Sequence, residues 1–271
     1  MHTLEKLKKN GFDITLLPPD KNGIINPDDI LSAIRPDTAL ITVMYANNEI
    51  GTLQPIEAIG KICRSRNIIF HTDAVQAVGH ISINVKNENI DMLSLSAHKF
   101  GGPKGIGVLY ARNGIPLTSI IEGGSQERNK RAGTENIPAI IGMTAALTES
   151  IGNISKNSEK LTCMRDRLIS ELTKIPHTVL NGDAKMRLPG NVNVCFEGIE
   201  GESLLLLLDA KGICASSGSA CTSGSLDPSH VLLAIGRPHE IAHGSLRLTL
   251  AEENTPDEVE YMIKAITDTV S

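Results

Sequence analysis

Ile68-Ile-Phe-His-Thr-Asp73 and Asp91-Met-Leu-Ser-Leu-Ser-Ala-His-Lys99 are two short runs of strand-forming residues, and each ends on a side chain capable of chemistry. Strand-like and helix-like segments alternate around them, with strands predicted at residues 13–17, 39–45, 68–72, 92–96 and 107–110. Between the first two strands, Asn26 offers a helix cap and Pro27 a first helical residue. Because such alternation is typical of βαβ units, we predict an α/β fold with a mostly parallel sheet.

Asp73 and Lys99 each stand at the carboxyl end of a predicted strand. In an open α/β sheet these ends converge on one crevice, where the two side chains can hold opposite ends of a flat cofactor. Pyridoxal 5'-phosphate requires such a pair, because a lysine amine condenses with its aldehyde and a carboxylate keeps its ring nitrogen protonated. The alternative is that both are ordinary strand-end residues, which every α/β protein contains.

The chain has 271 residues, 41% of them hydrophobic and 21% charged, as expected for one or two globular domains. We predict a large α/β domain over residues 1–150 and a smaller α+β domain over residues 151–271. A long helix is expected from residue 137 to about 172, a half-buried strand at 191–196, and a helix at 202–210 that buries five consecutive leucines. Asp227 is the predicted cap of a short helix, and Thr255 that of the last helix.

The composition narrows the class of partners. No apolar run approaches the roughly 20 residues of a membrane span, and a net charge of −5 argues against nucleic acid as the main partner. The five cysteines are odd in number and never form C-x-x-C, which indicates neither a disulfide framework nor a zinc site. With no signal-peptide pattern at the amino terminus, we expect a cytoplasmic protein with no metal and no membrane partner.

Two clusters suggest where the chemistry lies. Ser96 and His98 precede a glycine-rich turn at residues 101–107 and place a hydroxyl and an imidazole where a phosphate can bind. Cys221 has small, polar neighbours that suit an exposed nucleophile, although a surface thiol without function is the alternative. The other cysteines have apolar neighbours at helix or strand spacing and are predicted to be buried: Cys63, Cys163, Cys195 and Cys214.

Six motifs follow one another along the chain: Asn47-Asn-Glu-Ile-Gly-Thr-Leu-Gln, His71-Thr-Asp-Ala-Val-Gln, Ser96-Ala-His-Lys, Arg131-Ala-Gly-Thr-Glu-Asn, Ser216-Ser-Gly-Ser-Ala-Cys-Thr-Ser-Gly and Gly244-Ser-Leu-Arg-Leu. In this order and spacing they resemble the NifS/IscS cysteine desulfurases of the class V aminotransferase family, over essentially the whole chain. The resemblance implies a fold-type I pyridoxal phosphate enzyme that works as a homodimer. It also implies conversion of L-cysteine to L-alanine, with the sulfur left on an enzyme cysteine as a persulfide.

The resemblance implies a role for each matching residue. Lys99 condenses with the cofactor, and Asp73 pairs with its ring nitrogen. Arg247 and Asn48 hold the substrate carboxylate, Asn48 also belongs to the cofactor site, and Cys221 accepts the sulfur. The sulfur then passes to an acceptor protein, such as a scaffold for iron–sulfur cluster assembly. The remaining contacts implied for the cofactor are Gln76 to the phenolic oxygen, Ser96 and His98 to the phosphate, and Thr134 to the phosphate in the neighbouring subunit.

Members of this family carry a segment on the order of a hundred residues upstream of the point where this chain begins. That segment includes a glycine- and threonine-containing loop that holds most of the phosphate, and a histidine that stacks on the cofactor ring. We therefore expect the large domain to be incomplete. Two other interpretations stay open: a selenocysteine lyase-like enzyme with the same cofactor, and a non-catalytic protein that binds sulfur acceptors through its second domain.

Overall fold

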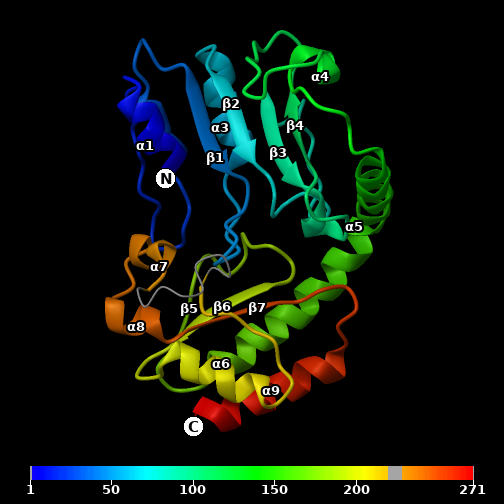
Figure 1. Cartoon of the computed structure of the whole chain (residues 1–271). Helices are drawn as coiled ribbons and strands as arrows, with labels where there is room; N and C mark the ends of the chain where they lie inside the picture. Colours follow the sequence, from blue (N-terminus) through cyan, green and yellow to red (C-terminus); the bar gives the residue numbers. More distant parts are fainter. Residues whose placement is uncertain (1, 219–227, 271) are drawn as a thin grey trace.

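The computed structural model of the protein describes residues 2–218 and 228–270. Its larger sheet has the strand order β1-β2-β3-β4 (Figure 1), formed by Leu40–Met44, Ile69–Asp73, Met92–Ser96 and Gly107–Ala111. Strands β1, β2 and β3 are parallel, and β4 runs antiparallel to β3. The α/β class and the mostly parallel sheet predicted from the sequence are confirmed.

A second, antiparallel sheet has the order β5-β6-β7, and helices pack around both sheets. Its strands are Thr178–Leu180, Asn191–Phe196 and Ser245–Thr249. The helical elements are α1 (His2–Lys9), α2 (Pro27–Ala33), α3 (Ile56–Ser65), the 3-10 helix η1 (Ala97–Phe100), α4 (Gln126–Asn129), α5 (Ile137–Leu172), α6 (Gly201–Asp209), α7 (His230–Ala234), α8 (His239–His243) and α9 (Pro256–Val270).

The strand predicted at residues 13–17 is wrong. These residues join no sheet among the described part of the chain, and strand β1 stands at the edge of its sheet. A run of strand-forming residues becomes a strand only where a neighbouring strand pairs with its backbone. Here the segment is tied down by side chains instead, since Arg35 forms an ion pair with Asp13 at 3.3 Å.

The first residues of two helices follow the prediction. The side-chain oxygen of Asn26 accepts a hydrogen bond from the backbone N–H of Asp28 at 3.0 Å and caps α2. At the start of α9, the Thr255 N–H donates to the Glu258 carboxylate at 2.8 Å, and the Glu258 N–H donates to the Thr255 hydroxyl at 3.3 Å. This reciprocal pair satisfies two backbone donors that a helix start leaves free.

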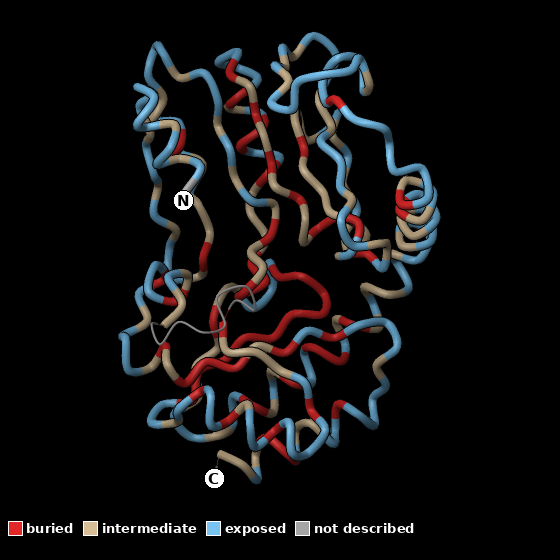
Figure 2. The backbone as a smooth tube through the Cα atoms, viewed as in Figure 1, coloured by how far each residue is buried: buried red, intermediate tan, exposed pale blue. Residues whose placement is uncertain are grey.

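Helix α3 covers one face of the larger sheet. Its residues Ile59 and Cys63 pack with Phe70 of β2 in one core, and all three are fully buried. One side of α3 is buried, as are Phe70 and Thr72 of β2, whereas no residue of β1 or β4 is fully buried (Figure 2). On the opposite face, Leu40 and Met44 of β1 are exposed, so polar side chains on that face of β2 and β3 can meet a ligand.

The central strand of the smaller sheet, β6, is buried on both faces. Leu168 of α5, Leu208 of α6 and Ile266 of α9 pack against one face and are fully buried. Strand β6 was predicted to be half-buried, but all six of its residues are buried. The reason is that the loop after β1 covers the other face, where the Asn193 side chain donates a hydrogen bond to the backbone oxygen of Glu49 at 3.0 Å.

Helix α5 connects the two sheets (Figure 1). By length and composition alone it would also pass as a membrane-spanning helix, but one such helix is weak evidence because buried core helices meet the same criterion. Its second half buries Leu161, Met164 and Leu168 in the core of the smaller sheet. The predicted domain boundary at residue 150 falls inside this helix, which runs unbroken from Ile137 to Leu172. The division into two domains stays a prediction.

Two predictions for the smaller unit need correction. Of the five leucines of α6, only Leu204 and Leu208 are buried, whereas Leu206 is 72% exposed, because a helix turns successive residues to different sides. Helix α7 is capped not by Asp227, which lies outside the described residues, but by Ser229, whose hydroxyl accepts from two backbone N–H groups of the first turn.

The two faces of α6 allow a matched test of this packing. We expect Leu208→Ala to lower the free energy of unfolding by about 2–5 kcal/mol, because it removes a buried side chain and leaves a cavity. Leu206→Ala, on the same helix, should change it by less than about 0.5 kcal/mol. Urea-induced unfolding followed by circular dichroism measures both, and equal losses would contradict this packing.

Candidate active site

The carboxyl ends of the three parallel strands lie together. Asp73 is the last residue of β2 and is paired in register with Ser94 of β3, and two residues later β3 ends at Ser96. The backbone N–H of Tyr45, just past β1, donates to the Asp73 carbonyl at 2.7 Å. The strand ends therefore lie side by side as predicted, with Lys99 in the η1 turn that follows β3, and the crevice between Asp73 and Lys99 stays a prediction.

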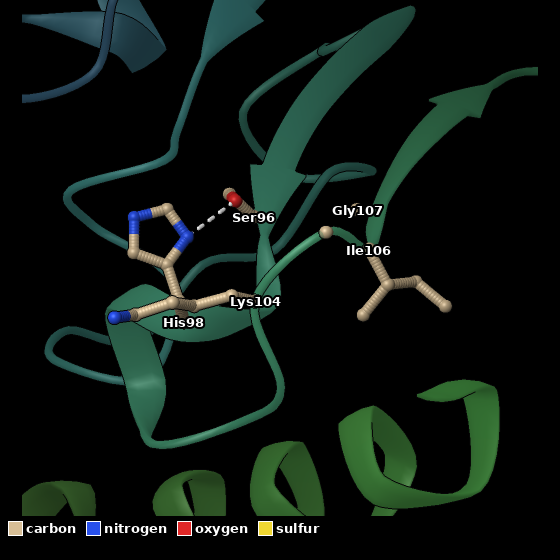
Figure 3. Close-up of a pocket in the computed structure, with 6 residues that line it drawn as sticks. Ser96, His98, Lys104, Ile106 and Gly107 are labelled. Carbon is tan, nitrogen blue, oxygen red and sulfur yellow. Dashed lines mark hydrogen bonds between the residues drawn. The ribbon is translucent and has the colours of Figure 1, made fainter. Parts of the chain in front are cut away.

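A hollow of about 420 Å³ opens beside this edge and is suited to an anion (Figure 3). Ser96 and His98 line it and are joined by a 2.8 Å hydrogen bond between Oγ and Nδ1. Lys104 also lines it, and sequence reasoning did not find this residue, although it stands in the glycine-rich turn. A hydroxyl, an imidazole and an ammonium group around one hollow fit a phosphate.

The turn around the hollow needs its glycines. Gly101 and Gly105 have φ of +80° and +84°, a region that side chains rarely adopt. At Gly107, a Cβ would lie 2.5 Å from the backbone oxygen of Leu95. Larger residues at these positions would push the backbone away from the hollow.

Lys99 is fixed through its backbone and free at its amine. Its carbonyl oxygen accepts a hydrogen bond from His80 Nε2 at 2.9 Å, and the residue is half-buried. Within residues 2–218 and 228–270, its Nζ forms no hydrogen bond or ion pair. A lysine amine without a protein partner is available to react with a carbonyl group.

A hydrogen-bonded row crosses the sheet next to Asp73. The His71 ring contacts the Thr42 hydroxyl at 2.7 Å through Nδ1 and the Ser94 hydroxyl at 2.9 Å through Nε2. His71 and Asp73 are two residues apart in one strand and so share a face. Burial lowers the pKa of His71 below its ordinary value, and the charge of Asp73 opposes this only in part.

Arg247 and Asn48 are brought together from distant parts of the sequence. Nη1 of Arg247, in β7, donates to the backbone oxygen of Asn48 at 3.2 Å. Gln76 lies in the turn that follows Asp73 and is half-buried. Thr134 is exposed in the segment before α5, and no described contact joins it to the Ser96–His98 hollow.

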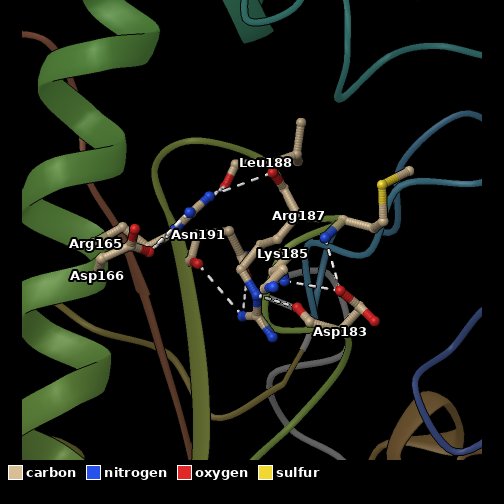
Figure 4. Close-up of polar contacts among 8 residues, drawn as sticks. Arg165, Asp166, Asp183, Lys185, Arg187, Leu188 and Asn191 are labelled. Atoms are coloured by element: carbon tan, nitrogen blue, oxygen red, sulfur yellow. Dashed lines mark hydrogen bonds and ion pairs between the residues drawn. The ribbon is translucent and has the colours of Figure 1, made fainter.

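Buried polar side chains hold the loop that carries Asn48. The side-chain amides of Asn191 and Asn193 both donate to the backbone oxygen of Glu49, at 3.1 and 3.0 Å. Arg187 is only 3% exposed, and its guanidinium donates to backbone oxygens of the adjacent turn, including that of Asp183 at 2.9 Å (Figure 4). Burial lowers the pKa of Arg187 to about 10, so it stays charged at neutral pH.

The four described cysteines divide into two pairs. Cys63 and Cys195 are buried as predicted, and burial raises the pKa of both thiols, that of Cys63 to about 12. Cys163 and Cys214 are exposed, which contradicts the prediction, because each lies on the solvent side of its apolar segment. Cys221 lies outside the described residues. No group of metal-ligating side chains is found in the described part of the chain.

Comparisons with known proteins identify the family of this chain. The sequence signature of the aminotransferase class-V family matches residues 2–262. The cysteine desulfurase IscS of Methanosarcina thermophila is 55% identical over 270 residues, which are 100% of this chain and 67% of that protein. A solved NifS-like protein superposes with a TM-score of 0.91 at 34% identity, over 98% of this chain and 70% of that one. SspA, solved in complex with cysteine, superposes with a TM-score of 0.78 at 37% identity, over 94% of this chain and 71% of SspA.

The fold is that of the fold-type I pyridoxal phosphate proteins. Within that class, the chain belongs to the aminotransferase class-V family and to its NifS/IscS cysteine desulfurase group. It spans about two thirds of the length of the curated relatives it matches. The resemblance inferred from six sequence motifs is confirmed.

The lowered pKa of His71 predicts how stability depends on pH. The unfolded imidazole has its ordinary pKa near 6.5 and takes up a proton that the folded chain resists, so stability falls as the pH drops below 6.5. In His71→Gln, the loss of stability that comes from protonation of His71 in the unfolded chain should disappear. Urea unfolding midpoints at pH 7.5 and pH 5.0 measure the effect, with exposed His239→Gln as control. Equal pH dependence in wild type and His71→Gln would contradict it.

Proposed function

We propose that this protein is a cysteine desulfurase, which converts L-cysteine to L-alanine and leaves the sulfur on Cys221. The observation that supports the proposal is that Asp73 ends β2, while Ser96, His98 and Lys104 line a hollow at the end of the neighbouring β3 and Lys99 directly follows His98. The bonded pair Arg247–Asn48 supplies a guanidinium for a carboxylate. The relative from Methanosarcina thermophila is named a cysteine desulfurase, and the similar SspA binds cysteine.

Pyridoxal 5'-phosphate is the cofactor of this family, and when bound it supplies an electron sink for the substrate carbanion. The residues proposed to hold it match its chemical groups. Ser96, His98 and Lys104 would bind its phosphate, and Asp73 would keep its ring nitrogen protonated. Gln76 would donate to its phenolic oxygen, Asn48 would contribute to the same site, and Lys99 would supply the amine that condenses with its aldehyde.

The chain's own residues perform the remaining steps. Arg247 and Asn48 hold the carboxylate of L-cysteine, which fixes the position of its Cβ–S bond. The Cys221 thiol then takes the sulfur, so that the Cβ–S bond breaks and an S–S bond forms. L-cysteine and the Cys221 thiol together give L-alanine and a Cys221 persulfide, which conserves every atom and requires no external oxidant.

We also propose a homodimer in which Thr134 reaches the phosphate of the neighbouring subunit. Ile137 and Ile141 at the start of α5 are 58% and 64% exposed, and Ile120 is 95% exposed. Exposed apolar side chains near one another in sequence support a protein partner for this region, and Thr134 lies among them. Residues 1–150 and 151–271 would then be a cofactor-binding domain and a smaller domain that carries Cys221.

The proposed sulfur acceptor is a scaffold protein for iron–sulfur cluster assembly. The proposed location is the cytoplasm, where a persulfide and free thiols persist under reducing conditions. All four described cysteines are free, and two of them are exposed.

The test of the proposed site is to add pyridoxal 5'-phosphate to the purified chain and reduce the product with borohydride. We expect one cofactor per chain, fixed on Lys99, because that amine has no described protein partner and Lys99 directly follows His98, which lines the hollow. Peptide mass spectrometry locates the label, and Lys99→Ala should lose it. Lys104→Ala should keep the site of labelling but weaken cofactor binding by about tenfold, the order expected for one charged hydrogen bond.

Alanine assays separate the alternatives. A desulfurase forms L-alanine from L-cysteine, and Cys221→Ala abolishes this. Efficient turnover of L-selenocysteine that does not need Cys221 would favour the lyase-like enzyme. A cofactor-loaded chain that forms no alanine yet binds a sulfur acceptor tightly would favour the non-catalytic interpretation and contradict the proposed function.

A further inference from the structure

The last two carbonyl groups of the η1 turn accept hydrogen bonds from side chains of other elements. Lys99 and Phe100 are the final residues of η1. The Lys99 carbonyl accepts from Nε2 of His80 at 2.9 Å, and the Phe100 carbonyl accepts from the Ser150 hydroxyl of α5 at 3.1 Å. Because a short helical turn leaves its final carbonyls without partners of its own, these two donors stabilise the end of η1.

His80 stands at the far end of the turn that follows Asp73. The backbone N–H of Val75 donates to Asp73 Oδ1 at 3.0 Å, and the N–H of His80 donates to the Ala77 carbonyl at 3.0 Å. These bonds keep the segment folded as a turn. One end of this turn therefore carries the Asp73 carboxylate, and the other end is bonded to Lys99.

The turn and η1 also pack closely against each other. A Cβ on Gly79 would lie 2.6 Å from the Cβ of Phe100, which is closer than two such atoms can come. Gly79 has a φ of +85°, and Phe100 is only 5% exposed. A glycine at this position is what lets the turn approach η1 closely enough for the His80 hydrogen bond.

Helix α5 holds both partners of this contact. The Ser158 hydroxyl donates to the His80 carbonyl at 2.9 Å, and Ser150 donates to Phe100. The two serines stand about two turns apart on one unbroken helix. The turn after Asp73 and the turn that carries Lys99 therefore have a common support.

We propose that His80 is a positioning residue that fixes the backbone of Lys99 relative to Asp73, and thereby places the Lys99 amine to condense with the cofactor aldehyde. The proposal rests on the proposed function, because it assumes that Asp73 and Lys99 hold the same cofactor. In the condensation the amine adds to the aldehyde, a C=N bond forms, and the aldehyde oxygen leaves as water. Without the His80 hydrogen bond the end of η1 can shift, and the amine is less often in position to attack.

The test measures how fast pyridoxal 5'-phosphate becomes fixed on Lys99 in the full chain, by borohydride reduction at timed intervals followed by peptide mass spectrometry. At saturating cofactor we expect His80→Ala to be labelled about fivefold more slowly, the order expected for one lost hydrogen bond. His80→Gln should restore the rate, because its side-chain amide can donate to the same carbonyl. His239→Gln, at an exposed position, is the control and should leave the rate unchanged.

Binding of pyridoxine 5'-phosphate separates positioning from cofactor binding. This probe has an alcohol in place of the aldehyde, so it can occupy the site but cannot condense with an amine. His80 does not line the hollow formed by Ser96, His98 and Lys104. We therefore expect His80→Ala to change the affinity for the probe by less than about twofold, because the phosphate contacts stay intact.

Labelling of Lys99 at the wild-type rate in folded His80→Ala would overturn the proposal. So would a loss of affinity for pyridoxine 5'-phosphate as large as the loss of rate, because that would place His80 in cofactor binding. If His80→Ala does not fold, Ser158→Ala removes the hydrogen bond that holds the His80 backbone and must slow the labelling in the same way.

An unlabelled Lys99 in the wild type would contradict the proposed function and leave the contact itself to be measured. The backbone N–H groups of Gly101 and Gly102 both donate to the Ala97 carbonyl and report on the end of η1. Their hydrogen exchange in the cofactor-free chain should accelerate in His80→Ala and return to the wild-type rate in His80→Gln. Unchanged exchange in His80→Ala would show that His80 does not hold the turn.

Discussion

The site depends on hydrogen bonds that hold the backbone of residues 48 and 49 between the two sheets. The amides of Asn191 and Asn193 donate to the Glu49 carbonyl, and the Arg247 guanidinium donates to the Asn48 carbonyl. These donors come from the smaller sheet, whereas the loop they hold continues from β1 of the larger one. Because buried polar groups are normally paired, these hydrogen bonds stabilise the loop in this position.

This constraint explains how residues far apart in the sequence form one site. The larger sheet alone positions Asp73 and Lys99 through its strand ends, and the glycine turn shapes the hollow beside them. Arg247 belongs to the smaller sheet and meets the loop after β1 at the backbone oxygen of Asn48. The buried Arg187 supports the turn that precedes β6, and through it the asparagines that hold the loop.

Local sequence patterns predicted the parts of the fold that depend on local interactions. Helix caps such as Asn26 and the strand ends at Asp73 and Ser96 agree with the structure, because they are set by neighbouring residues. The strand predicted at residues 13–17 failed, because pairing needs a distant partner. Leu206 and Cys163 were predicted to be buried but are exposed. Apolar neighbours in the sequence do not say which side of a helix faces solvent.

The site was predictable only in part from the residues themselves. Asp73 and Lys99 followed from strand ends, whereas the roles of Arg247, Asn48 and Thr134 came only from family motifs. Lys104 and the row through His71 were missed, because each depends on contacts between side chains that the sequence does not reveal. The one sequence signal for Lys104 was its position as a second lysine within the glycine-rich turn.

We infer that the smaller sheet holds the Asn48 loop and thereby completes the proposed carboxylate site. A double-mutant cycle on L-alanine binding to the cofactor-loaded chain tests it most directly, using Asn193→Ala and Arg247→Lys. Asn193 does not contact the proposed substrate position, yet we predict that the two changes couple by more than about 1 kcal/mol, because both act through the same loop. Losses that add to within about 0.3 kcal/mol would show that the loop and Arg247 act independently, and would contradict the account.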